Sequence, residues 1–496
     1  MTPGVNSDSS PRPNPTRRSA PFLLLAVLAV ALLAFYAVFA QRYVGASDWY
    51  GYYQEGVLFR HGRVTLPTEL PAAAYPAQAP LGFIVDRGRT ISQYTPGYPV
   101  LLALAGLAGL DFYVTPLVGF LSCVLMFRII RRRTDPWTAL LFALLWSLSP
   151  IVIWGSTQLM SDLVAATSLM LVYELCLARK PAWAGAAFVF AVAVRPTDGL
   201  FVLLLPVLLP GWRGRIRAVL GGLAPAVAYG AYNLVNFGAP WKTGYMDVRS
   251  DILAGFAGRN LAFYGTRLLA EVGPLALLLA VAGFVRLPKR GWIHAAWFSL
   301  FIGFYVFWRY PGNDSTWWWF RFVLPGLPPV FVLAADGFAC MRRTLAGGRL
   351  AGSAPALSAA VVLALLVAPV ESLRFCRRED VIKSTKGIEY RNIVRDAERL
   401  MPPGAWLGSV EFSGSTRLYT HLGSFMSTQG DAPALVARLI HDGKAVYLLV
   451  EPWNATNATI TTLLQRYHGQ QTHRFGLWGG VTLYRLGSAR LTKASP

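Results

Sequence analysis

The residues with the clearest capacity for chemistry lie just after the first hydrophobic segment, in residues 44–63, which read VGASDWYGYYQEGVLFRHGR. Asp48, Tyr52 and Glu55 stand at positions i, i+4 and i+7, so a helix would place them on one acidic and aromatic face. A carboxylate is one of the groups that takes up a proton in general-base catalysis. The stretch is therefore the first place to look for an active site.

The elements around this stretch must hold it at a membrane surface. A polar, proline-rich loop leads from it to Tyr94-Thr95-Pro96-Gly97-Tyr98-Pro99, where apolar sequence resumes. Long loops between hydrophobic segments usually carry function. The following apolar run, Pro99–Leu110, has only about a dozen residues and is short for a membrane crossing. We expect it to form a re-entrant or juxtamembrane helix that belongs to the first loop.

The composition is that of a polytopic membrane protein. The 496 residues are 54% hydrophobic and 14% charged, with a mean hydropathy of +0.42, which is more apolar than a soluble domain of this size. The net charge of +21 comes from short clusters between apolar runs, which indicates membrane topology and excludes a nucleic-acid-binding surface. The four cysteines show neither metal-ligand spacing nor a disulfide framework.

About eleven membrane spans are expected, with residues 1–20 as a disordered cytoplasmic N-terminus and residues 21–374 as the membrane domain. With eleven spans, the arginine and lysine clusters all fall on one side, which the positive-inside rule makes the cytoplasm. The expected spans are Pro21–Gln41, Tyr113–Ile130, Trp137–Ile151, Leu159–Ala178, Ala182–Val194, Gly199–Trp212, Ile216–Val235, Tyr264–Val285, Trp292–Trp308, Phe322–Met341 and Ser353–Leu373. The outer side then holds the first loop, residues 42–112, and the tail.

The tail, residues 375–496, is predicted to form an extracytoplasmic α/β domain. Its helix-like stretches are Gly387–Leu400 and Ala432–His441, and its strand-like stretches are Trp406–Phe412, Ala445–Val450 and Val481–Leu486. A domain of roughly 120 residues is within the usual size range.

Several short motifs resemble those of the GT-C class of integral-membrane glycosyltransferases, especially the branch of protein mannosyltransferases and lipid A aminoarabinose transferases. The motifs are Asp48 with Tyr52 and Gly62; Tyr94-Thr95-Pro96-Gly97-Tyr98-Pro99; Ser161-Asp162; Arg195-Pro196-Thr197; Asn236-Phe237-Gly238-Ala239-Pro240 through Gly244-Tyr245; and Arg321-Phe322-Val323-Leu324-Pro325. Thr95 and Asn236 depart from the pattern, where proline and arginine are usual. Together the motifs cover about residues 20–345.

The resemblance implies a fold of membrane helices and an enzyme that uses a polyprenyl-phosphate-linked sugar as donor. It implies transfer to an acceptor hydroxyl on the extracytoplasmic face, with inversion at the anomeric carbon. The acceptor would be a glycan, a lipid or a protein, and the location the bacterial inner membrane. An inverting transfer needs one carboxylate as base, because phosphate is already a good leaving group. Asp48 is the expected base; the alternative is a capping or interfacial acid on a solvated helix.

The same resemblance implies substrate-binding roles for Tyr52, Tyr94, Asp162, Arg195, Tyr245 and Arg321, and Glu55 could orient the sugar or the base. The alternatives are a solvated helix face for Glu55 and helix capping for Asp162. The departing lipid phosphate needs a cation, for which Arg321 is best placed. Competing cations are Arg195, Lys242, Arg259, Arg267 and Arg309. The run Trp317-Trp318-Trp319-Phe320 is either a substrate clamp or, by the more common pattern, an interfacial aromatic belt.

No cofactor is expected, since His61 and His294 lack ligand partners at helical spacing. The sequence nevertheless leaves a divalent cation open. Asn454 and Asn457 each begin a glycan acceptor triplet. The rival function is a transporter or flippase for lipid-linked sugars, but the inverted repeats typical of transporters are not evident. A non-catalytic scaffold is the second rival. The sequence determines neither the sugar nor the oligomeric state.

Overall fold

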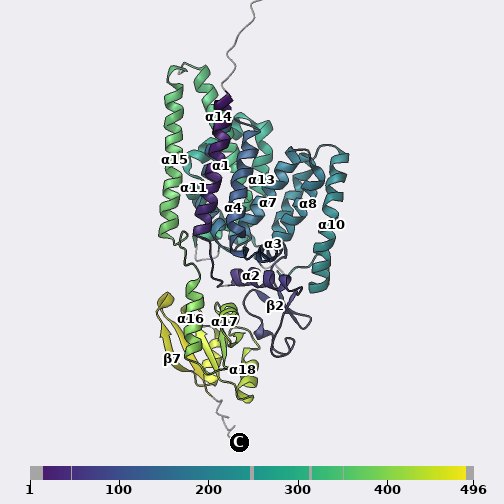
Figure 1. Ribbon diagram of the computed structural model, residues 1–496, viewed down its shortest axis with the longest axis vertical. Helices are drawn as coiled ribbons and strands as arrows, with labels where there is room; N and C mark the ends of the chain where they lie inside the picture. Colours follow the sequence, from purple (N-terminus) through teal and green to yellow (C-terminus); the bar gives the residue numbers. More distant parts are fainter. Residues whose placement is uncertain (1–14, 46, 246–250, 312–315, 350, 488–496) are drawn as a thin grey trace, which may run out of the picture.

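The computed structural model describes residues 15–45, 47–245, 251–311, 316–349 and 351–487. A long helical bundle forms one part, and a mixed sheet with its helices lies at one end of it, beyond the first loop (Figure 1). The larger bundle helices are α1 (Pro15–Val38), α4 (Val114–Arg131), α5 (Pro136–Ser147), α6 (Pro150–Thr157), α7 (Asp162–Leu177), α8 (Pro181–Val194), α10 (Trp212–Phe237), α11 (Ala257–Val272), α12 (Pro274–Arg286), α13 (Pro288–Val306), α14 (Pro328–Gly347) and α15 (Ala354–Arg378). Shorter elements between them are η2 (Asp111–Tyr113), η3 (Pro196–Leu203), α9 (Leu205–Leu208), η5 (Ala254–Phe256), η6 (Trp317–Gly326) and η7 (Ala351–Ser353).

Three of the expected single spans are pairs of helices that meet at a sharp bend. The axes of α5 and α6 differ by 65°, those of the segments Ala254–Val272 and α12 by 100°, and those of η6 and α14 by 71°. In each pair a proline, Pro150, Pro274 or Pro328, stands at the start of the second helix. Proline has no backbone N–H to continue the first helix but is well suited to begin the next.

Four helices are long and apolar enough to cross a membrane, or up to seven if each bent pair is one span, among the residues that the structure describes. The chain is thus a multi-pass membrane protein, and the count of eleven stays a prediction. The expected span Gly199–Trp212 is wrong as a continuous helix. Residues in this region form η3 and the single turn α9 instead, because Pro206 and Pro210 interrupt the run.

The first loop is a structured layer between the bundle and the tail. It contains α2 (Ser47–Arg60), η1 (Pro76–Gln78), α3 (Gly97–Gly106) and a three-stranded antiparallel sheet in the order β1-β3-β2. The strands are β1 (Thr65–Leu66), β2 (Phe83–Asp86) and β3 (Arg89–Ser92). The ten residues of α3 span about 15 Å, half of the thickness of a bilayer core.

The tail contains a five-stranded sheet in the order β5-β4-β6-β8-β7. Its elements are α16 (Ile388–Arg399), β4 (Trp406–Ser409), α17 (Ser413–Tyr419), β5 (Gly423–Met426), α18 (Ala432–His441), β6 (Val446–Val450), η8 (Pro452–Asn454), α19 (Ala458–Arg466), β7 (Gln470–Phe475), η9 (Leu477–Gly479) and β8 (Val481–Leu486). The predicted helices and strands are confirmed, with small differences at their ends. The sequence missed β5 and β7.

The tail packs against the first loop through backbone and side-chain hydrogen bonds. The Tyr419 hydroxyl accepts from the Val44 amide at 2.7 Å, Asp431 accepts from the Ala77 amide at 2.9 Å, and Ser413 Oγ accepts from the Leu81 amide at 3.0 Å. The first loop, and α2 within it, is therefore held between the bundle and the tail (Figure 1).

Candidate active site

Asp48, in the first turn of α2, is held by donors from two other parts of the chain. The Tyr94 hydroxyl donates to Oδ1 at 2.5 Å. The Arg321 guanidinium donates to Oδ2 at 2.8 Å and forms a salt bridge. The Asp48 side chain keeps 27% of its surface exposed, whereas that of Arg321 keeps 9%. Asp48 is therefore a positioned carboxylate that an incoming molecule can reach.

Arg321 lies in a cage of aromatic rings. Its guanidinium carbon is 5.1 Å from the Trp318 ring centroid, 5.5 Å from that of Trp319 and 5.7 Å from that of Trp154. Such cation–π contacts hold a guanidinium in place and keep it charged where water is scarce. Trp318 and Trp319 of the aromatic run thus contact the buried Arg321 guanidinium. An interfacial belt alone would not predict this contact.

A cluster of tyrosines extends from Asp48 along α2 and the start of α3. Tyr52 and Tyr94 have ring centroids 4.4 Å apart, and the Tyr245 ring is 6.1 Å from that of Tyr94. The Tyr52 hydroxyl shares a 2.8 Å hydrogen bond with Ser161 Oγ, which joins α2 to the start of α7. Burial and the charge of Asp48 raise the pKa of Tyr94 well above its ordinary value. The phenol therefore keeps its proton and donates a hydrogen bond to Asp48.

Asp162 and Arg195 form a second buried ion pair. Asp162 begins α7, and Arg195 directly follows α8. The Arg195 guanidinium carbon lies 5.5 Å from the Tyr305 ring centroid and 5.2 Å from that of Phe322. Phe322 is also 5.1 Å from the Arg321 guanidinium carbon, so the two arginines flank one ring. Asp162 is 3% exposed, so its carboxylate is buried in the ion pair with Arg195.

Glu55 is buried, with 1% of its surface exposed, so the reading as a solvated helix face is wrong. Tyr232 of α10 donates its hydroxyl to Glu55 Oε1 at 2.8 Å, and Oε2 has no hydrogen-bond partner among the described residues. Burial raises the pKa of Glu55 to about 8. The helical spacing placed Glu55 on the same face as Asp48, but only its burial in the folded chain makes it a protonated acid near neutral pH.

The tail brings a further acid to the neighbourhood. Burial, together with the charges of Glu451 and Asp48, raises the pKa of Glu411 to about 7. Glu451 accepts from the Glu411 amide at 2.9 Å and from Asn454 Nδ2 at 3.2 Å. The sequence offered no constellation in the tail, because Glu411 stands alone in a loop after β4.

Of the arginines predicted as candidate phosphate-binding cations, some lie at the site and others lie elsewhere. Arg321 and Arg195 reach the two carboxylates, while Arg309 forms a salt bridge with Asp251 at 3.4 Å and Arg259 donates to the Arg309 carbonyl at 3.1 Å. Tyr232 and Trp154 were missed by sequence reasoning. For Tyr232 a signal exists, since it is a hydroxyl in an apolar run four residues before Asn236.

The other polar candidates have structural partners. His294 is buried, and its Nε2 lies 2.9 Å from the Tyr173 hydroxyl. Asn457 caps α19 by accepting from the amides of Thr459 and Ile460. Within the described ranges, no group of three or more His, Cys, Asp and Glu side chains could hold a metal ion.

Comparisons with known proteins show which fold the chain shares with solved structures. No protein family model matches the chain, and no curated protein matches its sequence. Among solved structures, the chain is similar to apo ArnT from Cupriavidus metallidurans, with 15% identity, a TM-score of 0.58, and coverage of 95% of this chain and 100% of ArnT.

Two further solved structures show the same likeness. The Archaeoglobus fulgidus oligosaccharyltransferase, tethered to an acceptor peptide, has 12% identity and a TM-score of 0.56, with coverage of 96% of this chain and 75% of that protein. The arabinofuranosyltransferase AftD from Mycobacteria has 13% identity and a TM-score of 0.50, with coverage of 94% and 40%. At these identities the likeness is one of fold. The GT-C fold expected from the sequence motifs is confirmed.

Proposed function

We propose that this chain, which has the fold of GT-C glycosyltransferases, transfers a sugar from a polyprenyl-phosphate-linked donor to an acceptor hydroxyl. The observation that carries the proposal is the arrangement Tyr94–Asp48–Arg321, in which a partly exposed carboxylate is fixed between a phenol and a caged guanidinium. It is supported by the solved structure of ArnT with undecaprenyl phosphate, which has a TM-score of 0.54 at 13% identity.

In the proposed reaction, Asp48 accepts the proton of the acceptor hydroxyl while the acceptor oxygen attacks the anomeric carbon. The bond between that carbon and the phosphate oxygen breaks on the opposite face, so the configuration inverts. The bonding electrons leave with the polyprenyl phosphate. Arg321 contacts the leaving phosphate, since a guanidinium forms paired hydrogen bonds with phosphate oxygens. This ion pair is stronger in a site that holds little water. A leaving group already this stable needs no second acid.

The neighbouring residues hold these groups and the sugar. Arg195, paired with Asp162, supplies a second cation toward the donor phosphate. Tyr52, Tyr94 and Tyr245 form an aromatic wall with hydroxyls that suits a sugar ring, which is apolar on its faces and polar at its edges. Glu55, which is buried and accepts from Tyr232, is proposed to orient the sugar-binding side chains around it.

The proposed partners and location follow from the same fold. The acceptor is a glycan, a lipid or a protein; the Archaeoglobus structure, with its tethered acceptor peptide, is an example of the last in this fold. We place the reaction on the extracytoplasmic side of a bacterial inner membrane, with the N-terminus in the cytoplasm. The clusters of arginine and lysine at the end of the bundle away from the tail support this orientation.

The test is sugar transfer in membranes that contain the wild type, Asp48→Asn or Glu69→Gln. Glu69 is an exposed acid of the same loop and serves as the matched control. With labelled polyprenyl-phosphate sugars as donors, Asp48→Asn is expected to reduce transfer by at least about 100-fold, while Glu69→Gln is unchanged. Equal expression and equal thermal midpoints confirm that the variants are folded.

Full transfer by Asp48→Asn would remove Asp48 from the role of base. If the wild type transfers no sugar from any donor but moves lipid-linked sugars across vesicles, the protein is a transporter and the proposed function is wrong.

A further inference from the structure

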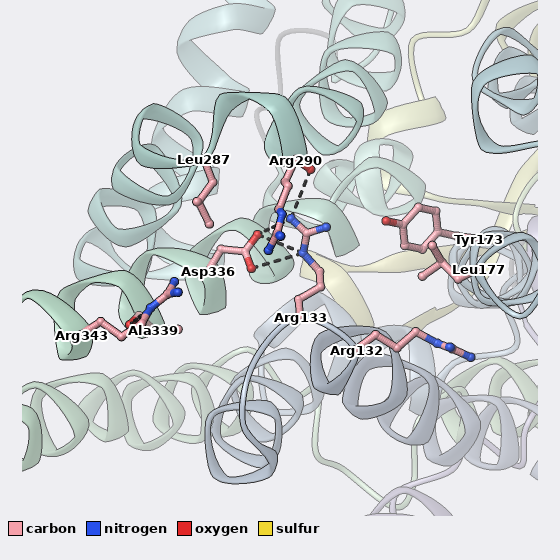
Figure 2. A pocket seen from close by; sticks show the side chains of 9 residues that line it. All are labelled: Arg132, Arg133, Tyr173, Leu177, Leu287, Arg290, Asp336, Ala339 and Arg343. Carbon is pink, nitrogen blue, oxygen red and sulfur yellow. Dashed lines mark hydrogen bonds and ion pairs between the residues drawn. The ribbon is translucent and has the colours of Figure 1, made fainter. Parts of the chain in front are cut away.

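A basic pocket lies at the end of the bundle away from the tail, and the proposed reaction does not use it. Its volume is about 420 Å³, which is within the usual range of small-molecule sites. The pocket lies between the C-terminal end of α4 and helices α7, α13 and α14 (Figure 2). Its lining residues are Arg132, Arg133, Tyr173, Leu177, Leu287, Arg290, Asp336, Ala339 and Arg343.

Two of the four arginines are fixed in the wall by carboxylates. Arg133 donates to Asp336 Oδ2 at 3.0 and 2.5 Å, to Asp336 Oδ1 at 3.2 Å, and to the Arg290 carbonyl at 3.2 Å. Figure 2 shows Arg133 between Asp336 and the backbone of Arg290. Arg132 donates to Glu174 at 2.8 and 2.9 Å. These bonds join four helices, so the pocket has a defined shape.

The other two arginines carry the excess charge. Among the described residues, neither Arg290 nor Arg343 forms a salt bridge with a carboxylate. The pocket therefore keeps two guanidinium groups, those of Arg290 and Arg343, that the carboxylates of Glu174 and Asp336 do not balance. An anion that accepts hydrogen bonds from several guanidinium groups would balance this charge, and phosphate is the group that their planar donors fit best.

The rest of the lining favours an anion attached to a lipid. Leu177, Leu287 and Ala339 form apolar parts of the wall, and the Tyr173 hydroxyl adds a polar group. A soluble anion gains nothing from apolar walls, whereas the glycerol and first methylenes of a lipid do. We propose that this pocket binds the phosphate headgroup of an anionic phospholipid from the adjacent leaflet. Basic pockets between membrane helices commonly bind such headgroups.

The experiment measures lipid binding to the purified full-length chain by native mass spectrometry, with phosphatidylglycerol as the probe. The variant Arg290→Gln/Arg343→Gln removes the excess charge. The control Arg213→Gln/Arg217→Gln removes the same charge from exposed positions of α10. We expect the pocket variant to bind phosphatidylglycerol about 30-fold more weakly, because each guanidinium that contacts the headgroup phosphate directly contributes about a factor of five. The control should bind as the wild type does.

Three results would overturn the proposal. They are equal loss in the two double variants, equal binding of phosphatidylglycerol and phosphatidylcholine by the wild type, and binding of inorganic phosphate as tight as that of the lipid. The variant Arg290→Lys/Arg343→Lys keeps the positive charge and controls for misfolding. Phosphatidylglycerol binding between that of the wild type and that of the glutamine variant supports the proposal. A folded lysine variant that binds no phosphatidylglycerol contradicts the charge argument. Since the readout is lipid binding, a failure here is distinct from a failure of sugar transfer.

Discussion

Replacing Glu55 by Gln should change how the stability of the protein depends on pH. The folded chain buries this carboxyl and raises its pKa from 4.5 to about 8. The unfolded chain releases the proton near its ordinary pKa, so between these two values the native state binds more protons than the unfolded state. Stability is therefore lost as pH rises through this window. Gln cannot titrate and still accepts from Tyr232, so Glu55→Gln avoids the loss.

The magnitude follows from the two pKa values. One pKa unit corresponds to about 1.36 kcal/mol, so the full difference between 4.5 and about 8 corresponds to up to about 5 kcal/mol. The free energy of unfolding of Glu55→Gln minus that of the wild type should be small near pH 4.5 and increase up to pH 8. Above pH 8 it should stay constant, because both states of the wild type are then ionised.

The assay is denaturant unfolding of the purified chain in mixed micelles at a series of pH values from 4.5 to 9. Other buried acids, such as Glu411, also titrate in this range, so only the difference between variant and wild type is informative. Glu69→Gln is the control, and its difference from the wild type should not change with pH. A constant difference for Glu55→Gln across pH 5 to 8.5 would refute the reasoning that Glu55 is buried as a neutral acid.

Two further predictions concern the ion pair beside the candidate site and the need for a metal. Arg195→Gln alone should destabilise the fold by about 3–5 kcal/mol, because it leaves the buried Asp162 carboxylate without its partner. The double variant Asp162→Asn/Arg195→Gln should recover most of this loss in the same unfolding assay, and a double variant as unstable as the single one would contradict the pairing. Chelation of divalent cations by EDTA should leave sugar transfer unchanged, because the described side chains offer no group of three or more metal-binding residues; loss of transfer that is restored by adding one cation would show that a metal takes part.

The sequence determined those features that depend on local chemistry and on period. Apolar length and charge clusters predicted a polytopic membrane protein, and a period of 3.6 predicted α18 at Ala432–His441 with the bounds that the structure has. The alternation of strand residues predicted β8 at Val481–Leu486 in the same way. The strand β7 was missed because five of its six residues are exposed, so no apolar face marks it.

The motif spacing placed Asp48, Tyr52 and Glu55 on one helix, but it left their partners open. Arg321 is 273 positions away from Asp48 along the chain, and Tyr232 is 177 positions from Glu55. No periodicity reaches over such distances, because the pairs form only when separate helices pack together. Tertiary structure alone therefore decided that Asp48 lies between a phenol and a guanidinium, and that Glu55 is buried and protonated rather than solvated.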